Sequence, residues 1–347
     1  MRMASVGHEM YGALVRRRTL IVACAAMLVA VLFLANAVLF TRWGAAEALK
    51  TLFDPGRSTS ALKSVIWSYR VPESCFGLLA GVALGMAGAE MQTILSNPLA
   101  EPYTLGISMS AAFGAALVIA FGIGTGSFGV YASVVLAFVC AMMSCAAIYL
   151  VARRPSTGKV TIILTGVALL FLFQAMVNGV QSLAGREASN AITFWMFGSL
   201  SRYTDMTYVY ILAVAVALVG VLFAMNLWRL SALKLGDEKV YSLGIDASKL
   251  RRNTIIGVSA VTAVAVSFTG TIGFVGLVGP HMARMLVGDD QRFLLPMSAL
   301  CGAVFLLASS VLIKGLSLTM PIGVITSLVG VPFFLYLLLG RKRRVVA

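Results

Sequence analysis

The segment RLSALKLGDEKVYSLGIDASKLRR, residues 229–252, determines how the rest of the chain can be arranged. It contains nine charged residues, in a chain that has 27 basic and 13 acidic side chains, and long apolar runs lie on both sides of it. Placing nine charges in lipid hydrocarbon would cost roughly 25 kcal/mol, at about 3 kcal/mol for each residue. The segment must therefore lie in water or against another protein.

Within this segment, Asp237–Leu243 is predicted to form one or two helical turns, because Gly236 and Gly244 mark its ends. Asp237 and Glu238 also suit the positive N-terminal end of a helix. Such a helix can be a solvated loop helix, or it can be a docking element that receives force from a soluble partner. Composition alone does not choose between the two.

The composition of the whole chain is that of a polytopic membrane protein. Its 347 residues are 60% hydrophobic and 12% charged, with a mean hydropathy of +0.94. The net charge of +14 is attributed to basic cytoplasmic loops, and no nucleic acid is expected as a partner. Five scattered cysteines and two histidines offer no ligand spacing, so neither disulfides nor a metal site nor a bound cofactor is expected.

The apolar runs predict an all-α membrane protein with about ten transmembrane helices, in a single domain over 1–347. The first is interpreted as an uncleaved helix, since it is too long for a signal peptide. The eighth is short, and its glycine-rich start at 270–279 predicts a broken or re-entrant segment buried in protein. The ten spans are 19–41, 71–96, 104–122, 128–152, 160–182, 205–227, 253–270, 274–288, 293–313 and 321–340.

The distribution of basic residues orients these spans. With the N-terminus in the cytoplasm, 19 of the 27 basic residues fall on cytoplasmic segments and eight on external ones. This bias predicts a multi-pass protein of the cell membrane with both termini in the cytoplasm. It also places segment 229–252 in the cytoplasm.

Two spans carry patterns of small or polar residues. In the second, Gly77, Gly81, Gly85 and Ala89 form a ridge that predicts close helix packing, with Glu90 following it. We have no physical account of Glu90 from the sequence. The fifth span carries amides on one face, which either hydrogen-bond neighbouring helices or line a polar cavity, the second being favoured. These amides are Gln174, Asn178 and Gln181.

The sequence offers no nucleotide site of its own and little sign of ion coupling. Residues 156–161 resemble half of a phosphate-binding loop, but Arg153 stands where the leading glycine would be and Val160 where Ser or Thr would be. The spans contain few ionisable groups, whereas proton- or sodium-coupled carriers usually keep carboxylates at mid-membrane.

Four stretches together resemble the permeases of the iron-chelate, haem and vitamin B12 importers. They are QTILSNPLAEP at 92–102 with Leu105-Gly106, LGDEKVYSLGI at 235–245, GFVGLVGPHMARMLVGDDQRFLLP at 273–296 and PIGVITSLVGVPFF at 321–334. The resemblance covers nearly the whole chain in matching order and spacing. The motif positions are Gln92, Asn97, Pro98, Leu99, Ala100, Pro102, Gly106, Gly276, Pro280, His281, Arg284, Pro321, Gly323 and Gly330.

The resemblance implies the permease of a type II ABC importer, which is not itself an enzyme. In this family two permeases, identical or close paralogues, join two cytoplasmic ATPases that hold ATP and Mg, and an external binding protein delivers the ligand. The resemblance also implies that the pathway at the permease dimer interface includes the fifth span. It assigns contact with the ATPase to Leu235, Gly236, Asp237, Glu238, Tyr241, Leu243 and Gly244.

The function expected from the resemblance is ATP-driven import of a metal chelate. A ferric siderophore is the leading substrate, with haem and cobalamin as alternatives. An ion-coupled secondary carrier or a channel is the alternative class of function. Uptake that survives without ATP would distinguish these from an ABC importer.

The external rim departs from the family pattern. Members commonly read Arg-Leu-Pro-Arg where this chain reads Arg70-Val71-Pro72-Glu73. The resemblance assigns docking of the binding protein to Arg70, with Lys314 and Arg57 as further cations. Glu73 is expected either to pair with Arg70 one helical turn away or to meet a basic residue of the binding protein.

Overall fold

The structure is a computed structural model that describes the chain apart from residues 1, 57, 125–126, 155–156, 204 and 341–347. Every regular element in these described ranges is a helix, as expected. Each of the ten predicted spans corresponds to one helix. These are α1 (Arg2–Val38), α4 (Val71–Leu95), α5 (Ile107–Ala120), α6 (Ser127–Ala152), α7 (Lys159–Leu183), α9 (Met206–Ala224), α12 (Ala247–Thr269), α13 (Val275–Val287), α14 (Gln291–Gly315) and α15 (Ile322–Gly340).

Length and composition divide these helices into two groups. Among the described residues, seven helices are long and apolar enough to cross a membrane. The apolar parts of α5, α13 and α15 are shorter. The membrane-protein class follows from the seven long helices, and the short ones pack against other helices of the bundle.

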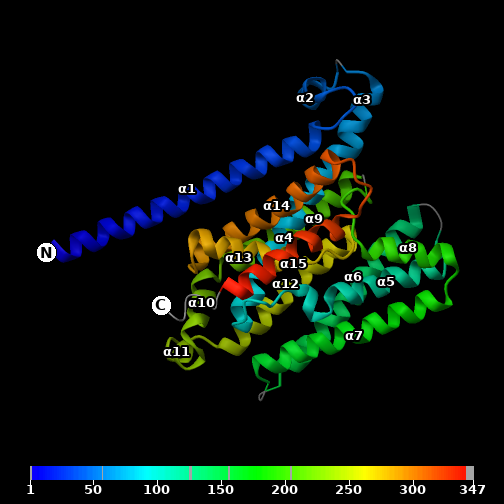
Figure 1. Cartoon of the computed structure of the whole chain (residues 1–347). Helices are drawn as coiled ribbons and strands as arrows, with labels where there is room; N and C mark the ends of the chain where they lie inside the picture. The colour runs from blue at the N-terminus through cyan, green and yellow to red at the C-terminus, as the bar shows by residue number, and fades with distance from the viewer. Residues whose placement is uncertain (1, 57, 125–126, 155–156, 204, 341–347) are drawn as a thin grey trace.

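The remaining helices lie at the two ends of the bundle (Figure 1). One end, called here the α2 end, carries α2 (Ala45–Phe53), α3 (Ser60–Ser64) and α8 (Arg186–Met196). The other, called the α11 end, carries α10 (Leu227–Ala232) and α11 (Asp237–Ser242). The start of α1 and the last turns of α15 also lie at the α11 end. The structure therefore puts the start of α1 and the end of α15 on the same side of the bundle as segment 229–252.

Helix α4 is the centre of the bundle, and its small-residue ridge makes the packing that the sequence predicts. A Cβ atom on Gly81 would lie 2.5 Å from the Cα atom of Ala303 in α14. One on Gly88 would lie 1.9 Å from the carbonyl oxygen of Gly276 in α13. Backbones this close leave no room for a side chain, so these contacts require glycine.

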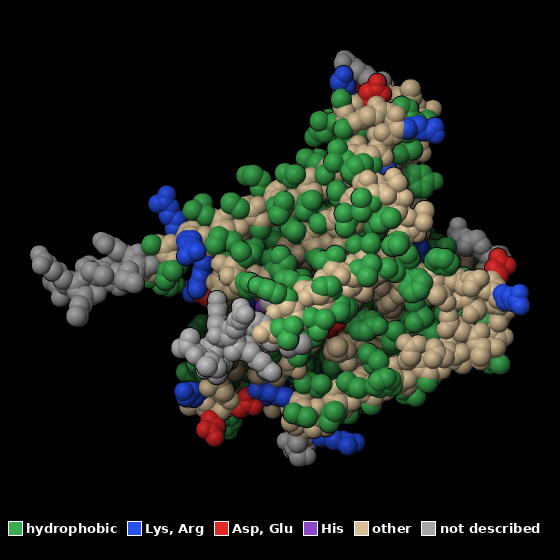
Figure 2. All heavy atoms as spheres, in the orientation of Figure 1, with side chains coloured by type: hydrophobic (Ala, Val, Ile, Leu, Met, Phe, Trp, Pro, Cys, Tyr) green, Lys and Arg blue, Asp and Glu red, His purple; other side chains and the backbone are tan. Residues whose placement is uncertain are grey.

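Burial separates inner helices from outer ones. In the most apolar 18-residue window, 78% of residues are buried for the helix that contains α4, but 22% for α7. Figure 2 shows hydrophobic side chains over the middle of the visible face, with charged side chains gathered mainly towards its edges. This is the surface expected where lipid or a second apolar subunit surrounds the bundle.

The eighth predicted span is confirmed as a short, buried segment with an irregular start. Residues 270–274 are not helical, and α13 begins only at Val275. Phe274 adopts a left-handed conformation with φ of 68°, which is uncommon for a residue with a bulky side chain. The surrounding protein contacts this segment on both sides: Ser199 donates to the carbonyl of Thr269 just before it at 2.7 Å, and the hydroxyl of Thr271 within it donates to the carbonyl of Met196.

Candidate functional sites

The charged segment 229–252 folds into α10, a 3-10 turn at Leu233–Leu235, and α11. Gly236 and Gly244 have φ of 92° and 73°, so both ends of the short helix use the left-handed region that favours glycine. The predicted helix and its punctuation are therefore confirmed. The turn lies at the α11 end of the bundle (Figure 1).

The surface of this turn carries exposed apolar side chains. Tyr241 is 81% exposed, Leu235 56% and Leu243 48%. Val240, by contrast, is fully buried and anchors the helix to the bundle. Three large apolar side chains exposed within nine residues favour the docking element over a simple solvated helix.

Asp237 is tied within the chain rather than left free on this surface. Arg251 of α12 donates from Nη1 to Asp237 Oδ2 at 2.9 Å, and its Nη2 contacts the other carboxylate oxygen. Hydrogen bonding from Arg251 is the main cause that lowers the pKa of the Asp237 carboxyl below its ordinary value. Arg251 also donates from Nε to the carbonyl of Ile94 at 3.1 Å. Arg251 thus joins α11 to α12 and to the end of α4.

A second polar network ties the same region to α13. Lys234, in the 3-10 turn, lies 3.5 Å from Asp289, and Arg284 lies 3.2 Å from the same carboxylate. Arg284 also donates to the side chain of Gln92, whose Nε2 donates to the carbonyl of Gly276 at 3.3 Å. The motif residues Gln92 and Arg284 therefore hold α4, α13 and the 3-10 turn at Leu233–Leu235 together.

The motif after α4 forms a tight turn. Asn97 Oδ1 accepts from the amide of Leu99 at 3.0 Å, which closes a turn around Pro98. The next residue, Ala100, is buried. Pro102 begins a 3-10 turn that ends at Gly106, whose φ is 74°. A Cβ atom on Gly106 would lie 2.8 Å from the amide nitrogen of Leu170 in α7. This turn sets how closely α7 approaches the core.

The last motif positions α15 against the irregular segment. Gly323 donates from its amide to the carbonyl of Phe197 at 3.0 Å, just after Pro321. A Cβ atom on Gly330 would lie 2.6 Å from the side chain of Phe274. Pro280 lies inside α13, and the ring of His281 lies 6.2 Å from that of Phe333 in α15.

A groove of about 1040 Å³ lies between α7, α15 and residues 271–274. Of the three predicted amides only Gln174 lines it, donating to Asn178 Oδ1 at 2.9 Å. Gln181 instead donates to Thr193 Oγ1 of α8 at 3.1 Å. Gln174 thus lines a groove, whereas Gln181 hydrogen-bonds a neighbouring helix, so each interpretation of the amides applies to a different residue. Sequence spacing missed the groove's other polar residues, among them the buried Glu101, although Glu101 lies within the first motif.

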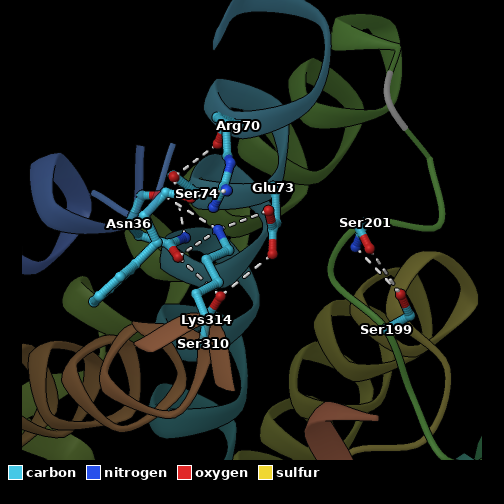
Figure 3. Close-up of polar contacts among 9 residues, drawn as sticks. Asn36, Arg70, Glu73, Ser74, Ser199, Ser201, Ser310 and Lys314 are labelled. Carbon is cyan, nitrogen blue, oxygen red and sulfur yellow. Dashed lines mark hydrogen bonds and ion pairs between the residues drawn. The ribbon is translucent and has the colours of Figure 1, made fainter. Parts of the chain in front are cut away.

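The acidic residue at the α2 end has a partner that the sequence did not indicate. Glu73 Oε2 lies 2.8 Å from Lys314 Nζ of α14, and the two side chains are only 16% and 13% exposed. Lys314 also donates to Asn36 Oδ1 of α1 at 2.7 Å, and Ser310 donates to the same oxygen at 2.9 Å. Figure 3 shows these side chains pointing toward one another from three helices.

This arrangement corrects the expected pairing of Glu73 with Arg70. Among the described residues no ion pair joins Glu73 to Arg70, whose Nη2 instead donates to the carbonyl of Phe40 at 3.3 Å. Lys314 pairs internally with Glu73, and its role in docking a binding protein stays a prediction. Packing of α14 against α4 brings Lys314 next to Glu73. This buried contact is stronger than an exposed pair between Arg70 and Glu73, one helical turn apart, would be. Arg57 lies outside the described residues.

The apolar helices, the groove and the exposed turn at residues 235–243, called here the docking turn, are features expected of a multi-pass membrane permease. The sequence model of the FecCD transport family matches residues 26–340. The chain belongs to this family, and so to the ABC permeases that work with an ATPase and a substrate-binding protein. The membership favours an ABC permease over an ion-coupled carrier or a channel.

Individual relatives agree in length as well as in sequence. A cobalamin import system permease of Halobacterium salinarum is 36% identical over 81% of this chain and 74% of its own length. A permease of Helicobacter pylori, named for an iron chelatin transport system, is 35% identical over 84% of this chain and 87% of its own.

Among solved structures, an inward-facing metal-chelate type ABC transporter has a TM-score of 0.81, at 27% identity. It covers 92% of this chain and 99% of that one. This similarity confirms the fold of a type II ABC importer permease.

Proposed function

We propose that this chain forms the membrane pathway for ATP-driven import of a metal chelate, with a ferric siderophore as the leading substrate. The observation that carries this is the exposed apolar turn at α11, which Arg251 fixes both to Asp237 and to the end of α4. A partner that pushes on this turn would move the central helix. ATP closure on a separate ATPase provides such a push.

The substrate class is supported by relatives and by the groove. The relatives named above are permeases for cobalamin and an iron chelatin, both of which are metal chelates. The groove of about 1040 Å³ is at the upper limit of typical small-molecule sites, as a bulky chelate requires. Its polar groups include Glu101, Tyr103 and Gln174, among apolar residues that suit a large ligand.

The assembly we propose contains two permease copies, identical or closely related, two ATPases that bind ATP and Mg, and an external binding protein. The α11 end faces the cytoplasm, so both termini are cytoplasmic. The poorly buried α7 supports a second copy on that face, since its amides at Gln174 and Asn178 would otherwise face lipid.

The test is uptake into proteoliposomes that contain the permease and its ATPase, with the binding protein outside. We expect uptake of the ferric chelate only with ATP and Mg on the ATPase side, unaffected by an ionophore. A variant ATPase that binds but does not hydrolyse ATP is the matched control. Uptake without ATP that collapses with the ionophore would contradict the proposal.

A further inference from the structure

A cavity of about 500 Å³ lies at the α2 end, apart from the groove described above. It is open to the surface and is bordered by α8, residues 198–202, the end of α14 and the start of α15. Figure 3 shows two facing walls: Glu73, Lys314 and Ser310 on one side, and Ser199 and Ser201 on the other. All five residues line the cavity, as does Arg202.

Arg202 is held in the cavity wall by the end of α8. Its Nη2 donates to the carbonyl of Trp195 at 3.1 Å, and its guanidinium lies 5.0 Å from the centre of the Trp195 ring. Gly270 makes this possible, because a Cβ atom there would lie 2.4 Å from the Trp195 carbonyl oxygen and 3.2 Å from Arg202 Nη2. The arginine is therefore positioned by the fold rather than loosely placed in solvent.

Two buried donors at this wall have no acceptor. Arg202 Nη1 and Trp195 Nε1 are both buried and make no hydrogen bond. The phenol of the neighbouring Tyr203 interacts with the Arg202 guanidinium but carries no charge to balance it. No carboxylate in the described part of the chain forms an ion pair with Arg202. The guanidinium charge therefore has no anionic partner there, which favours a ligand that supplies oxygen atoms.

The charges of the lining residues also favour an anionic ligand. On the opposite wall Glu73 and Lys314 neutralise each other at 2.8 Å. Arg202 is then the one uncompensated charge among the lining residues that the structure describes. The hydroxyls of Ser199 and Ser201, 3.4 Å apart, add further hydrogen-bonding groups. A planar guanidinium beside hydroxyl donors is well suited to a carboxylate.

We propose that this cavity binds a carboxylate group of a small ligand, with Arg202 as the donor and Ser199 and Ser201 as auxiliary contacts. The physiological ligand, a carboxylate-bearing metal chelate, rests on the proposed import function. The cavity lies within the size range of small-molecule sites, so it accommodates a whole small chelate or one arm of a larger one.

The experiment uses the fluorescence of Trp195, in the wall of the cavity, to report ligand binding. Replacing Trp43, Trp67 and Trp228 by Phe leaves Trp195 as the single tryptophan. The full-length variant in lipid nanodiscs is titrated with citrate, without ATP, and its fluorescence is recorded. We expect a saturable change that is at least tenfold weaker in affinity after Arg202→Gln. Arg186→Gln, at the exposed start of α8, is the control and should bind citrate as the parent does.

The result that overturns the proposal is the absence of a saturable change, or equal affinity after Arg202→Gln. If Arg202→Gln fails to fold, Ser199→Ala combined with Ser201→Ala should weaken binding several-fold, and unchanged affinity would overturn it. An acidic side chain of a binding protein as the true occupant would appear as no response to citrate. Because transport and ATP are not involved, failure here leaves the import function standing, and loss of ATP-driven uptake leaves this binding result standing.

Discussion

Asp237 and Arg251 join the docking turn to the membrane helices: Arg251 Nη1 donates to Asp237 Oδ2 at 2.9 Å. The arginine is 9% exposed and also holds the carbonyl of Ile94, so its position is fixed from both sides. The exposed face of the turn and its buried attachment are therefore separate residues. This separation allows docking and force transmission to be tested independently.

Removing the attachment should uncouple the transporter without dissociating it. In Arg251→Met, the turn keeps its exposed side chains, but Asp237 and the end of α4 lose their common partner. We expect the ATPase to remain bound and hydrolysis to continue, while uptake per ATP falls about tenfold. Uptake and hydrolysis are measured together in proteoliposomes. Arg252→Met is the neighbouring control, and an equal loss in both variants would contradict a specific role.

Removing the docking surface should have the opposite result. Tyr241 is 81% exposed and contributes little to folding of the permease alone. Tyr241→Ala should weaken ATPase binding about tenfold or more, or about 1.4 kcal/mol, as for an aromatic anchor at an interface. The melting temperature of the isolated permease should be unchanged. Binding is measured by titration of the ATPase onto immobilised permease.

Charge reversal distinguishes the two acidic residues of this turn. Glu238 is exposed, whereas Asp237 pairs with Arg251. Glu238→Lys should therefore weaken ATPase binding without destabilising the permease. Asp237→Lys should do both, because it places a cation beside Arg251. Equal thermal stability of the two variants would show that the Asp237–Arg251 pair contributes nothing to folding.

The pair at the α2 end should behave as a buried ion pair. Lys314→Met leaves Glu73 without its cation and should destabilise the permease by about 3 kcal/mol. Adding Glu73→Gln should restore much of this loss, because the isolated charge is then removed. Thermal unfolding in nanodiscs measures both effects. Destabilisation in the double variant equal to or larger than that in Lys314→Met would contradict the pairing.

The three amides of α7 should differ in access to water. In a background lacking the five native cysteines, Gln174→Cys should react with a water-soluble thiol reagent, and its rate should change with the nucleotide state. Gln181→Cys, behind the contact to Thr193, should react more slowly. Equal protection at both positions in every state would show that the groove is not a wet pathway.

The sequence predicted the helices, the small-residue ridge and the glycine-bounded turn, because each depends on neighbours close in the chain. It did not predict Lys314 as the partner of Glu73, since those residues lie on different helices. Spacing within α4 indicated Arg70 instead, because periodicity defines the face of a helix but not what packs on it. Arg251 and Glu101 were missed for the same reason: burial, rather than pattern, gives them their contacts.

The glycine contacts of α4 limit how this permease can change shape. Where Gly81 meets Ala303 and Gly88 meets Gly276, main chain rests on main chain, and no side chain is available to rotate or yield. A push delivered through Arg251 to Ile94 cannot be absorbed locally. It must rotate α4, α13 and α14 together as one rigid body. The mobile joints then lie at its periphery, along α7, where few residues are buried.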